Sequence, residues 1–321
     1  MKLAPAYHLR TNKAVERLLF VELLRKLDRT LEKPVSKYWY VSLGGAYLED
    51  FALIHSTFGN QWMTSLEIKK EIRTRQLINQ PHSRIDLTLD STTEFAANYQ
   101  TGRKPLIVWF DFENIDWKNQ ILEFCELAQK LPPMSILKIT LPCNASWLGN
   151  APKDPLLERS QKLNSLFADF GPFSPEDTSK NKICNTVYRI LHKAIANALP
   201  DTKMRCVRTL ASYQYDDGTP ILTVALIIGP IKKIEKITGD AGLTKWPFAD
   251  LNWSGQKEIA IPALSAREKI AVDRLLPDAS ARQVVGKLKL RLAEDYQKSI
   301  QAMSNYVQLY RHVPQFLRVT F

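Results

Sequence analysis

The chain has 321 residues, of which 45% are hydrophobic and 24% charged, so it is long enough for one large α/β domain with additions or for two domains. Its net charge of +11 is uneven: residues 1–150 carry 19 basic against 16 acidic side chains, and residues 151–321 carry 25 against 17. No segment approaches the roughly 20 apolar residues of a membrane span. We therefore expect no membrane association. The four cysteines are widely spaced, which argues against a zinc site or a disulfide framework and predicts a cytoplasmic location.

The chain begins with an expected helical segment, residues 1–36. Within it, residues 12–31 contain neither glycine nor proline and carry apolar side chains at helical spacing, which predicts an amphipathic helix.

The next stretch has the layout of the first half of a nucleotide-binding βαβ unit. An aromatic and β-branched strand, Tyr38–Leu43, is followed by Gly44 and Gly45, which lack a Cβ and allow a close turn around a ligand. A helix over Tyr47–Phe58 leads to a second strand that ends at Glu67. A carboxylate at that position can accept both hydroxyls of an adenosine ribose. An ordinary βαβ unit with an unrelated glutamate remains the alternative.

Strands and helices continue to alternate, which predicts an open, doubly wound, parallel sheet. The predicted strands lie at 84–89, 105–112 and 134–141, and the helices at 69–79, 91–99, 116–131 and 182–199. The strings MRCVRTLASYQY and PILTVALIIG, joined by DDGT, then predict an antiparallel hairpin. Among doubly wound folds this ending marks the class I S-adenosylmethionine-dependent methyltransferases.

We therefore expect an α/β fold with a Rossmann-like, doubly wound, mostly parallel sheet of seven strands over residues 37–230. An irregular insertion is expected at about 142–180, because that stretch is rich in proline, asparagine, aspartate and serine. We expect residues 231–321 to form a basic helical extension, with helices predicted over Ser265–Leu276 and Ser280–Tyr306.

The order and spacing of several strings resemble a known family: YVSLGGAYLEDFALIH, SLE, RQLINQP, VWFDFEN, LSAREKIAVDRLLP and NYVQLYRHVPQF. They are similar to a group of bacterial proteins described as putative O-methyltransferases, relatives of the three-Cys-motif partner proteins. The resemblance covers roughly residues 37–142 and 260–316. It implies a class I methyltransferase fold and binding of S-adenosyl-L-methionine, with no established methyl acceptor.

The resemblance also implies roles for individual residues at the carboxyl ends of the strands. Gly44 and Gly45 would surround the methionine portion of the cofactor, and Glu67 would hold the ribose. Asp90 and Ser91, after the third strand, would lie at the adenine edge. The expected cofactor is thus S-adenosyl-L-methionine, and no resident metal site is predicted.

Asp111 and Glu113, at the end of the fourth strand, would face the transferred methyl group and the substrate. Either carboxylate could serve as a base or bind a divalent ion that acidifies an acceptor hydroxyl; helix capping by Asp111 is the alternative. Ser42 stands where related glycine turns carry an acidic residue, which leaves open that catalysis has been lost. Arg75 and Asn79, one helical turn apart, are predicted to brace the loop before the third strand; contact of Arg75 with an anionic substrate is the alternative.

Two hypotheses follow. The first is an active methyltransferase acting on a small molecule, nucleic acid or protein. The second is a catalytically silent scaffold of the same fold that binds a partner protein or nucleic acid, within a bacterial antiviral defence system. The basic surplus of residues 151–321 makes a polyanionic partner one of the possibilities.

Overall fold

The computed structural model describes residues 10–150 and 153–314, which fall into two compact units. The sheet unit comprises residues 21–214 and 218–257, and the helical unit comprises residues 10–20, 215–217 and 258–314. No helix in these described ranges is both long enough and apolar enough to cross a bilayer.

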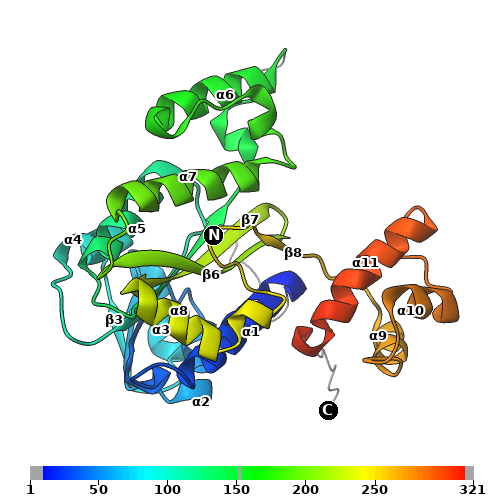
Figure 1. The fold of residues 1–321 in the computed structure, drawn as a ribbon, viewed down its shortest axis with the longest axis horizontal. Helices are drawn as coiled ribbons and strands as arrows, with labels where there is room; N and C mark the ends of the chain where they lie inside the picture. The colour runs from blue at the N-terminus through cyan, green and yellow to red at the C-terminus, as the bar shows by residue number, and fades with distance from the viewer. Residues whose placement is uncertain (1–9, 151–152, 315–321) are drawn as a thin grey trace. The chain divides into compact units, whose positions relative to one another are not determined.

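The central sheet has eight strands in the order β3-β2-β1-β4-β5-β7-β6-β8 (Figure 1). Strands β1 to β5 pair in parallel, and β7 pairs antiparallel with β5, which confirms the predicted fold class and its hairpin ending. The prediction of seven strands missed only β8, whose three residues are too short to give a periodic signal. The strands are β1 Trp39–Ser42, β2 Trp62–Leu66, β3 Ile85–Thr88, β4 Leu106–Asp111, β5 Ile136–Pro142, β6 Cys206–Asp216, β7 Pro220–Gly229 and β8 Lys257–Ile259.

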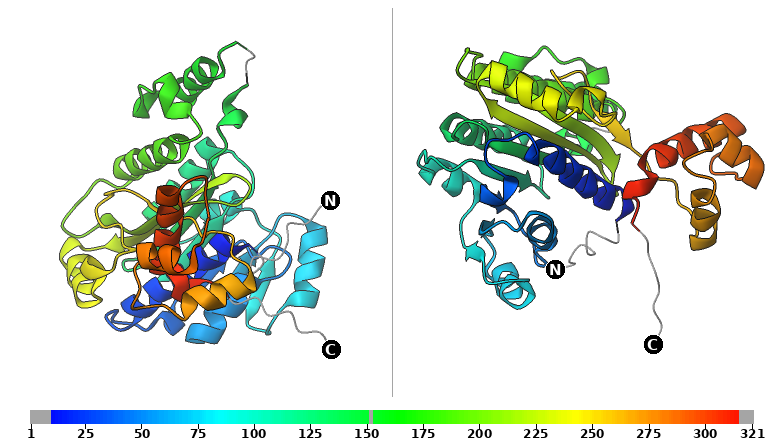
Figure 2. Two further views of the ribbon diagram at one scale, coloured as in Figure 1. Left: turned by 90° about the vertical axis from the view of Figure 1, so that its right-hand side faces the viewer. Right: turned by 60° about the horizontal axis from the view of Figure 1, so that its bottom comes forward.

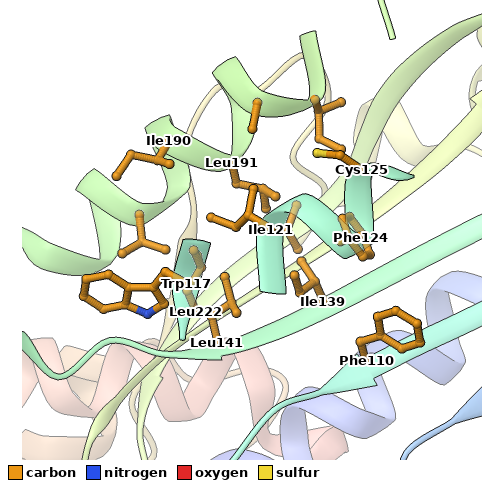
Figure 3. Close-up of a cluster of buried hydrophobic side chains, with 14 of the residues drawn as sticks. Phe110, Trp117, Ile121, Phe124, Cys125, Ile139, Leu141, Ile190, Leu191 and Leu222 are labelled. Carbon is orange, nitrogen blue, oxygen red and sulfur yellow. The ribbon is translucent and has the colours of Figure 1, made fainter. Parts of the chain in front are cut away.

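The main core lies between one face of the sheet and helices α5 (Trp117–Lys130) and α7 (Ile183–Ala198), as Figure 3 shows. Every residue of β4 and β5 is buried, as expected for central parallel strands with both faces covered. Alternate residues of β4, among them Phe110, point into this core, and Phe124 of α5 packs against the Phe110 ring.

Helix α2 covers part of the opposite face of the sheet (Figure 2). Phe51 of that helix makes an edge-to-face ring contact with Tyr40 of β1. Tyr40 and Val41 point to opposite faces of the sheet, as neighbouring residues of a strand do, and only Val41 belongs to the main core. Besides α5 and α7, the α-helices that precede β8 in the described residues are α1 Thr11–Asp28, α2 Glu49–Phe58, α3 Lys70–Asn79, α4 Thr92–Asn98, α6 Pro155–Leu166 and α8 Ile231–Asp240.

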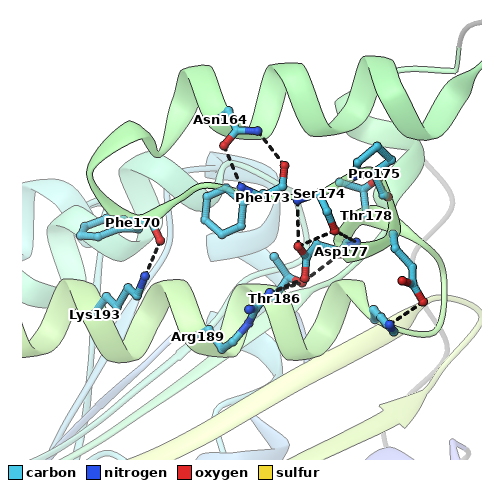
Figure 4. Close-up of polar contacts among 12 residues, drawn as sticks. Asn164, Phe170, Phe173, Ser174, Pro175, Asp177, Thr178, Thr186, Arg189 and Lys193 are labelled. Atoms are coloured by element: carbon cyan, nitrogen blue, oxygen red, sulfur yellow. Dashed lines mark hydrogen bonds and ion pairs between the residues drawn. The ribbon is translucent and has the colours of Figure 1, made fainter.

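The insertion after β5 is ordered by hydrogen bonds to its own loops and to α7 (Figure 4). The Asn164 amide of α6 donates to the Phe173 carbonyl and accepts from the Phe173 N–H, both at 2.8 Å. Asp177, in the capping box of Ser174, pairs with Arg189 of α7 at 2.5 Å. The stretch that looked irregular in sequence is thus built from short helices that α7 supports.

The helical unit contains α9 (Ala266–Asp273), α10 (Ala281–Leu288) and α11 (Tyr296–Leu309). The prediction of one continuous helix over Ser280–Tyr306 was wrong. Lys289 adopts φ 51°, which ends α10, and the Asp295 side chain accepts the Lys298 N–H, which starts α11. No glycine or proline marks the break, so composition gave no warning of it.

Candidate active site at the carboxyl edge of the sheet

The strand order reverses beside β1, because β2 lies on one side of it and β4 on the other. In open α/β sheets ligands bind at such a switch point, outside the carboxyl ends of the strands. The predicted site residues follow β1, β2, β3 and β4, so the topology gathers them along this one edge.

The glycine turn after β1 is tightly packed against the protein itself. A Cβ on Gly44 would lie 2.3 Å from Leu48 Cδ2 and 2.7 Å from Ser65 Oγ, so no larger residue fits. Gly45 has φ +52°, in the left-handed region that favours glycine. Leu48 also has positive φ, at 54°, and helix α2 begins only after it, at Glu49. The predicted start of this helix at Tyr47 was therefore two residues early.

Side chains of helix α3 hold the glycine turn in place through hydrogen bonds. The Gln76 amide, fully buried, donates to the Gly45 carbonyl at 2.8 Å and to Ser65 Oγ at 3.1 Å. Asn79 donates to the Ala46 carbonyl at 2.8 Å. The prediction that Asn79 steadies the loop before β3 was wrong, because its bond is to the glycine turn. Gln76 was missed, and its signal is a polar residue at the inward position of α3.

Arg75 also reaches this turn: its guanidinium donates to the Tyr47 hydroxyl at 3.3 Å and lies 5.1 Å from the centre of the Tyr47 ring. It therefore contacts the turn after β1 and not the loop before β3, for which it was predicted. Tyr47 is 38% exposed, so this cation–aromatic pair lies at the surface of the turn.

Two carboxylates, Glu67 after β2 and Glu113 after β4, follow strands on either side of β1. Glu67 is half-buried, and its Oε1 accepts the Lys69 N–H at 2.9 Å. Burial raises the pKa of Glu67 above its ordinary value; backbone hydrogen bonds from Lys69 and Ile68 oppose this rise, and the negative charge of exposed Glu113 adds to it. A half-buried carboxylate with a raised pKa is a common feature of ligand sites.

Asp90 and Ser91 lie between β3 and α4, and they differ in their environments. Ser91 caps α4: its Oγ accepts the Glu94 N–H at 3.0 Å, and its own N–H donates to Glu94 Oε2 at 2.8 Å. The hydroxyl and the N–H of Ser91 are therefore already hydrogen-bonded to Glu94 in the first turn of α4. Asp90 is exposed at the sheet edge, where its carboxylate can meet a ligand.

Asp111 and Glu113 do not share one environment. Asp111, the last residue of β4, is only 5% exposed, whereas Glu113 is exposed. On the same sheet face as Asp111, the buried Lys138 ammonium of β5 lies 3.1 Å from the centre of the Trp109 ring. Sequence reasoning missed Lys138, although a lysine inside the apolar strand ILKITLP was the signal for it.

No group of three or more histidine, cysteine or acidic side chains in residues 10–150 and 153–314 is arranged to hold a metal ion. The cysteines are free and buried, and burial raises the pKa of Cys125 to about 12, so its thiol is a poor nucleophile at neutral pH.

The model of a family described as "Putative O-methyltransferase" matches residues 5–321. A search of curated proteins found no match.

Solved structures with partial similarity include methyltransferases. The 16S rRNA (adenine(1408)-N(1))-methyltransferase of Catenulisporales acidiphilia is 12% identical over 65% of this chain and 92% of its own, with a TM-score of 0.36. The N-methyltransferase NodS of Bradyrhizobium japonicum is 11% identical over 67% and 97%, also with 0.36. A fibrillarin/Nop5p complex is 9% identical over 67% and 82%, with 0.37. Similarity at this level says nothing about what this chain binds or methylates.

Proposed function

The chain belongs to the family described as "Putative O-methyltransferase", and we propose that it uses S-adenosylmethionine to methylate an acceptor oxygen at the carboxyl edge of β1, β2 and β4. The observation that carries this proposal is the convergence of three features at the switch point. These are the braced turn at Gly44–Gly45, the half-buried Glu67, and Glu113, whose charge reaches Glu67.

The residues present fit most of this cofactor. Glu67 would accept hydrogen bonds from the ribose hydroxyls, and the exposed Asp90 would accept from the exocyclic amine of adenine. The turn at Gly44–Gly45 would lie against the methionine portion. Beneath it, the buried Ser42 Oγ has no hydrogen-bond partner among the described residues. A hydroxyl there offers weaker recognition of the cofactor's amino group than the carboxylate found in related turns, so we expect modest affinity.

When bound, S-adenosylmethionine supplies a methyl group that is already activated on a sulfonium. The protein's task is to place the acceptor in line and to take its proton. Glu113 suits the second role because it is exposed at the end of β4, whereas Asp111 is buried. With the cofactor bound, the Glu113 carboxylate would accept the proton of the acceptor hydroxyl as its oxygen receives the methyl group.

Calorimetric titration of the full chain with S-adenosylmethionine and with S-adenosylhomocysteine tests the proposal. We expect saturable binding of both, with a dissociation constant on the order of 1–100 μM. No heat and no thermal shift at millimolar cofactor would refute it. Binding without methyl transfer to any acceptor, in wild type as in Glu113→Gln, would favour the scaffold hypothesis instead.

A further inference from the structure

A second functional surface lies in the helical unit, on the outer side of α10. Val284 and Val285 pack inward against Met303 and Tyr306 of α11. Helical geometry then turns the neighbouring positions outward, and Arg282, Gly286 and Lys287 are indeed exposed. The core contact of α10 therefore fixes the direction of a polar stripe on its other side.

This stripe is one wall of a groove of about 650 Å³ within the helical unit. Residues of the turn between α9 and α10 form the opposite wall. The groove is lined by Arg274, Leu275, Asp278, Ala279, Arg282, Gln283, Gly286 and Lys287. The lining therefore contains three cationic side chains, Arg274, Arg282 and Lys287, and one carboxylate, Asp278.

Two lysines of this unit form ion pairs, whereas the three cations of the groove form none among the described residues. Elsewhere in this unit Lys269 pairs with Asp273 at 2.5 Å and Lys298 pairs with Glu294 at 2.6 Å. Among the described residues, the side chains of Arg274, Arg282 and Lys287 make no hydrogen bond or ion pair. Three unpaired cations around one hollow create a local positive field that suits an anionic chain.

An exposed aromatic ring stands beside the same stripe. Tyr296, the first residue of α11, is 49% exposed. Its hydroxyl lies 3.5 Å from the position that a Cβ on Gly286 would take, so the ring lies next to α10. Cations that follow a backbone and a ring on which a base can stack are the two elements of single-stranded nucleic-acid sites.

We propose that this groove binds single-stranded nucleic acid, with backbone phosphates on Arg274, Arg282 and Lys287 and one base stacked on Tyr296. The phosphates supply most of the affinity, because each neutralised phosphate releases counterions. The ring supplies the preference for unpaired bases, which a duplex does not expose for stacking. This proposal does not depend on cofactor binding in the sheet unit.

The test uses fluorescence anisotropy with the full chain and labelled oligomers of about ten nucleotides, within the range of site sizes for single-strand binders. The oligomers are single-stranded RNA, single-stranded DNA and an RNA duplex. Binding is measured across a salt series. We expect both single strands to bind more tightly than the duplex.

The triple variant R274A/R282A/K287A should bind RNA at least about tenfold more weakly at low salt. Its slope of log affinity against log salt should be shallower by about 2, since each of three phosphates contributes about 0.7. The matched control R103A/K203A/K232A removes three exposed cations from the sheet unit and should keep the wild-type slope. Equal losses in both triple variants would overturn the proposal in favour of a general effect of net charge.

Tyr296→Ala should weaken binding to single strands by about fivefold or more, while Tyr296→Phe keeps the ring and the affinity. Polyglutamate, which has charge but no bases, should compete far less well than RNA. No binding at low salt, or equal competition by polyglutamate, would refute the proposal. Calorimetry with S-adenosylmethionine on the same variants separates this result from any failure at the sheet edge, because these variants leave that edge unchanged.

Discussion

Replacement of Glu67 is the sharpest test of the sheet-edge site, because this residue should affect affinity and stability in opposite directions. Two charge-assisted hydrogen bonds to a ribose are worth roughly 1.5–3 kcal/mol each. Glu67→Ala should therefore weaken S-adenosylmethionine binding by about two orders of magnitude or more, since each 1.4 kcal/mol is about tenfold. Isothermal calorimetry measures this loss. Glu67→Gln, which keeps the shape and loses the charge, should be intermediate.

The raised pKa of Glu67 gives the second half of this prediction. A carboxyl group whose pKa is higher in the folded than in the unfolded protein destabilises the fold as pH rises through and above 4.5, its ordinary value. Without cofactor, Glu67→Gln should thus melt at a higher temperature than wild type at neutral pH. The difference should disappear as pH falls below 4.5, where the glutamate is protonated in both states. Thermal melts across pH measure it.

Glu71→Ala provides the matched control, because Glu71 is an exposed carboxylate in the first turn of α3. It should change neither cofactor affinity nor the pH dependence of melting. Unchanged cofactor affinity in Glu67→Ala would refute the placement of the ribose. A Glu67→Gln protein that melts below wild type at neutral pH would instead show that the buried charge is compensated in the folded protein.

Three further predictions concern the support of the fold. Gly44→Ala should cost about 1–3 kcal/mol in chemical denaturation, because its Cβ would clash with three side chains; a smaller loss would mean that the turn can relax. The centroids of the His55 and His82 rings lie 3.7 Å apart with the ring planes tilted by 31°. Burial, followed by the His55 charge, lowers the pKa of His82, so the stability of the fold should fall as pH drops below 6.5, the ordinary value. His82→Gln should flatten that fall. Asn164→Ala removes both bonds to Phe173 and should speed proteolysis of the insertion, whereas equal cleavage rates would show that α7 alone holds it.

The sequence was sufficient for the fold class, because the strands and helices of the sheet unit have strong local patterns. The apolar run that ends at Asp111 had the length and composition of a buried strand, and the hairpin around Gly218 had two strand-like runs joined by turn residues. Structural features with weak local sequence patterns were not predicted. The three-residue β8 and the break between α10 and α11 depend on pairing and capping that no periodicity records.

For the candidate site, the sequence proposed the turn at Gly44–Gly45 and the strand-end carboxylates, because glycine pairs and acidic residues after strands can be recognised in the sequence alone. Tertiary structure alone decided their environments. It buried Asp111 and exposed Glu113, although the two are only two residues apart. It placed Gln76 under the turn, 31 residues away in the chain. Burial and hydrogen bonding depend on which elements pack together in space, so local sequence sets the candidates while the packed sheet and its helices set their charge, reach and support.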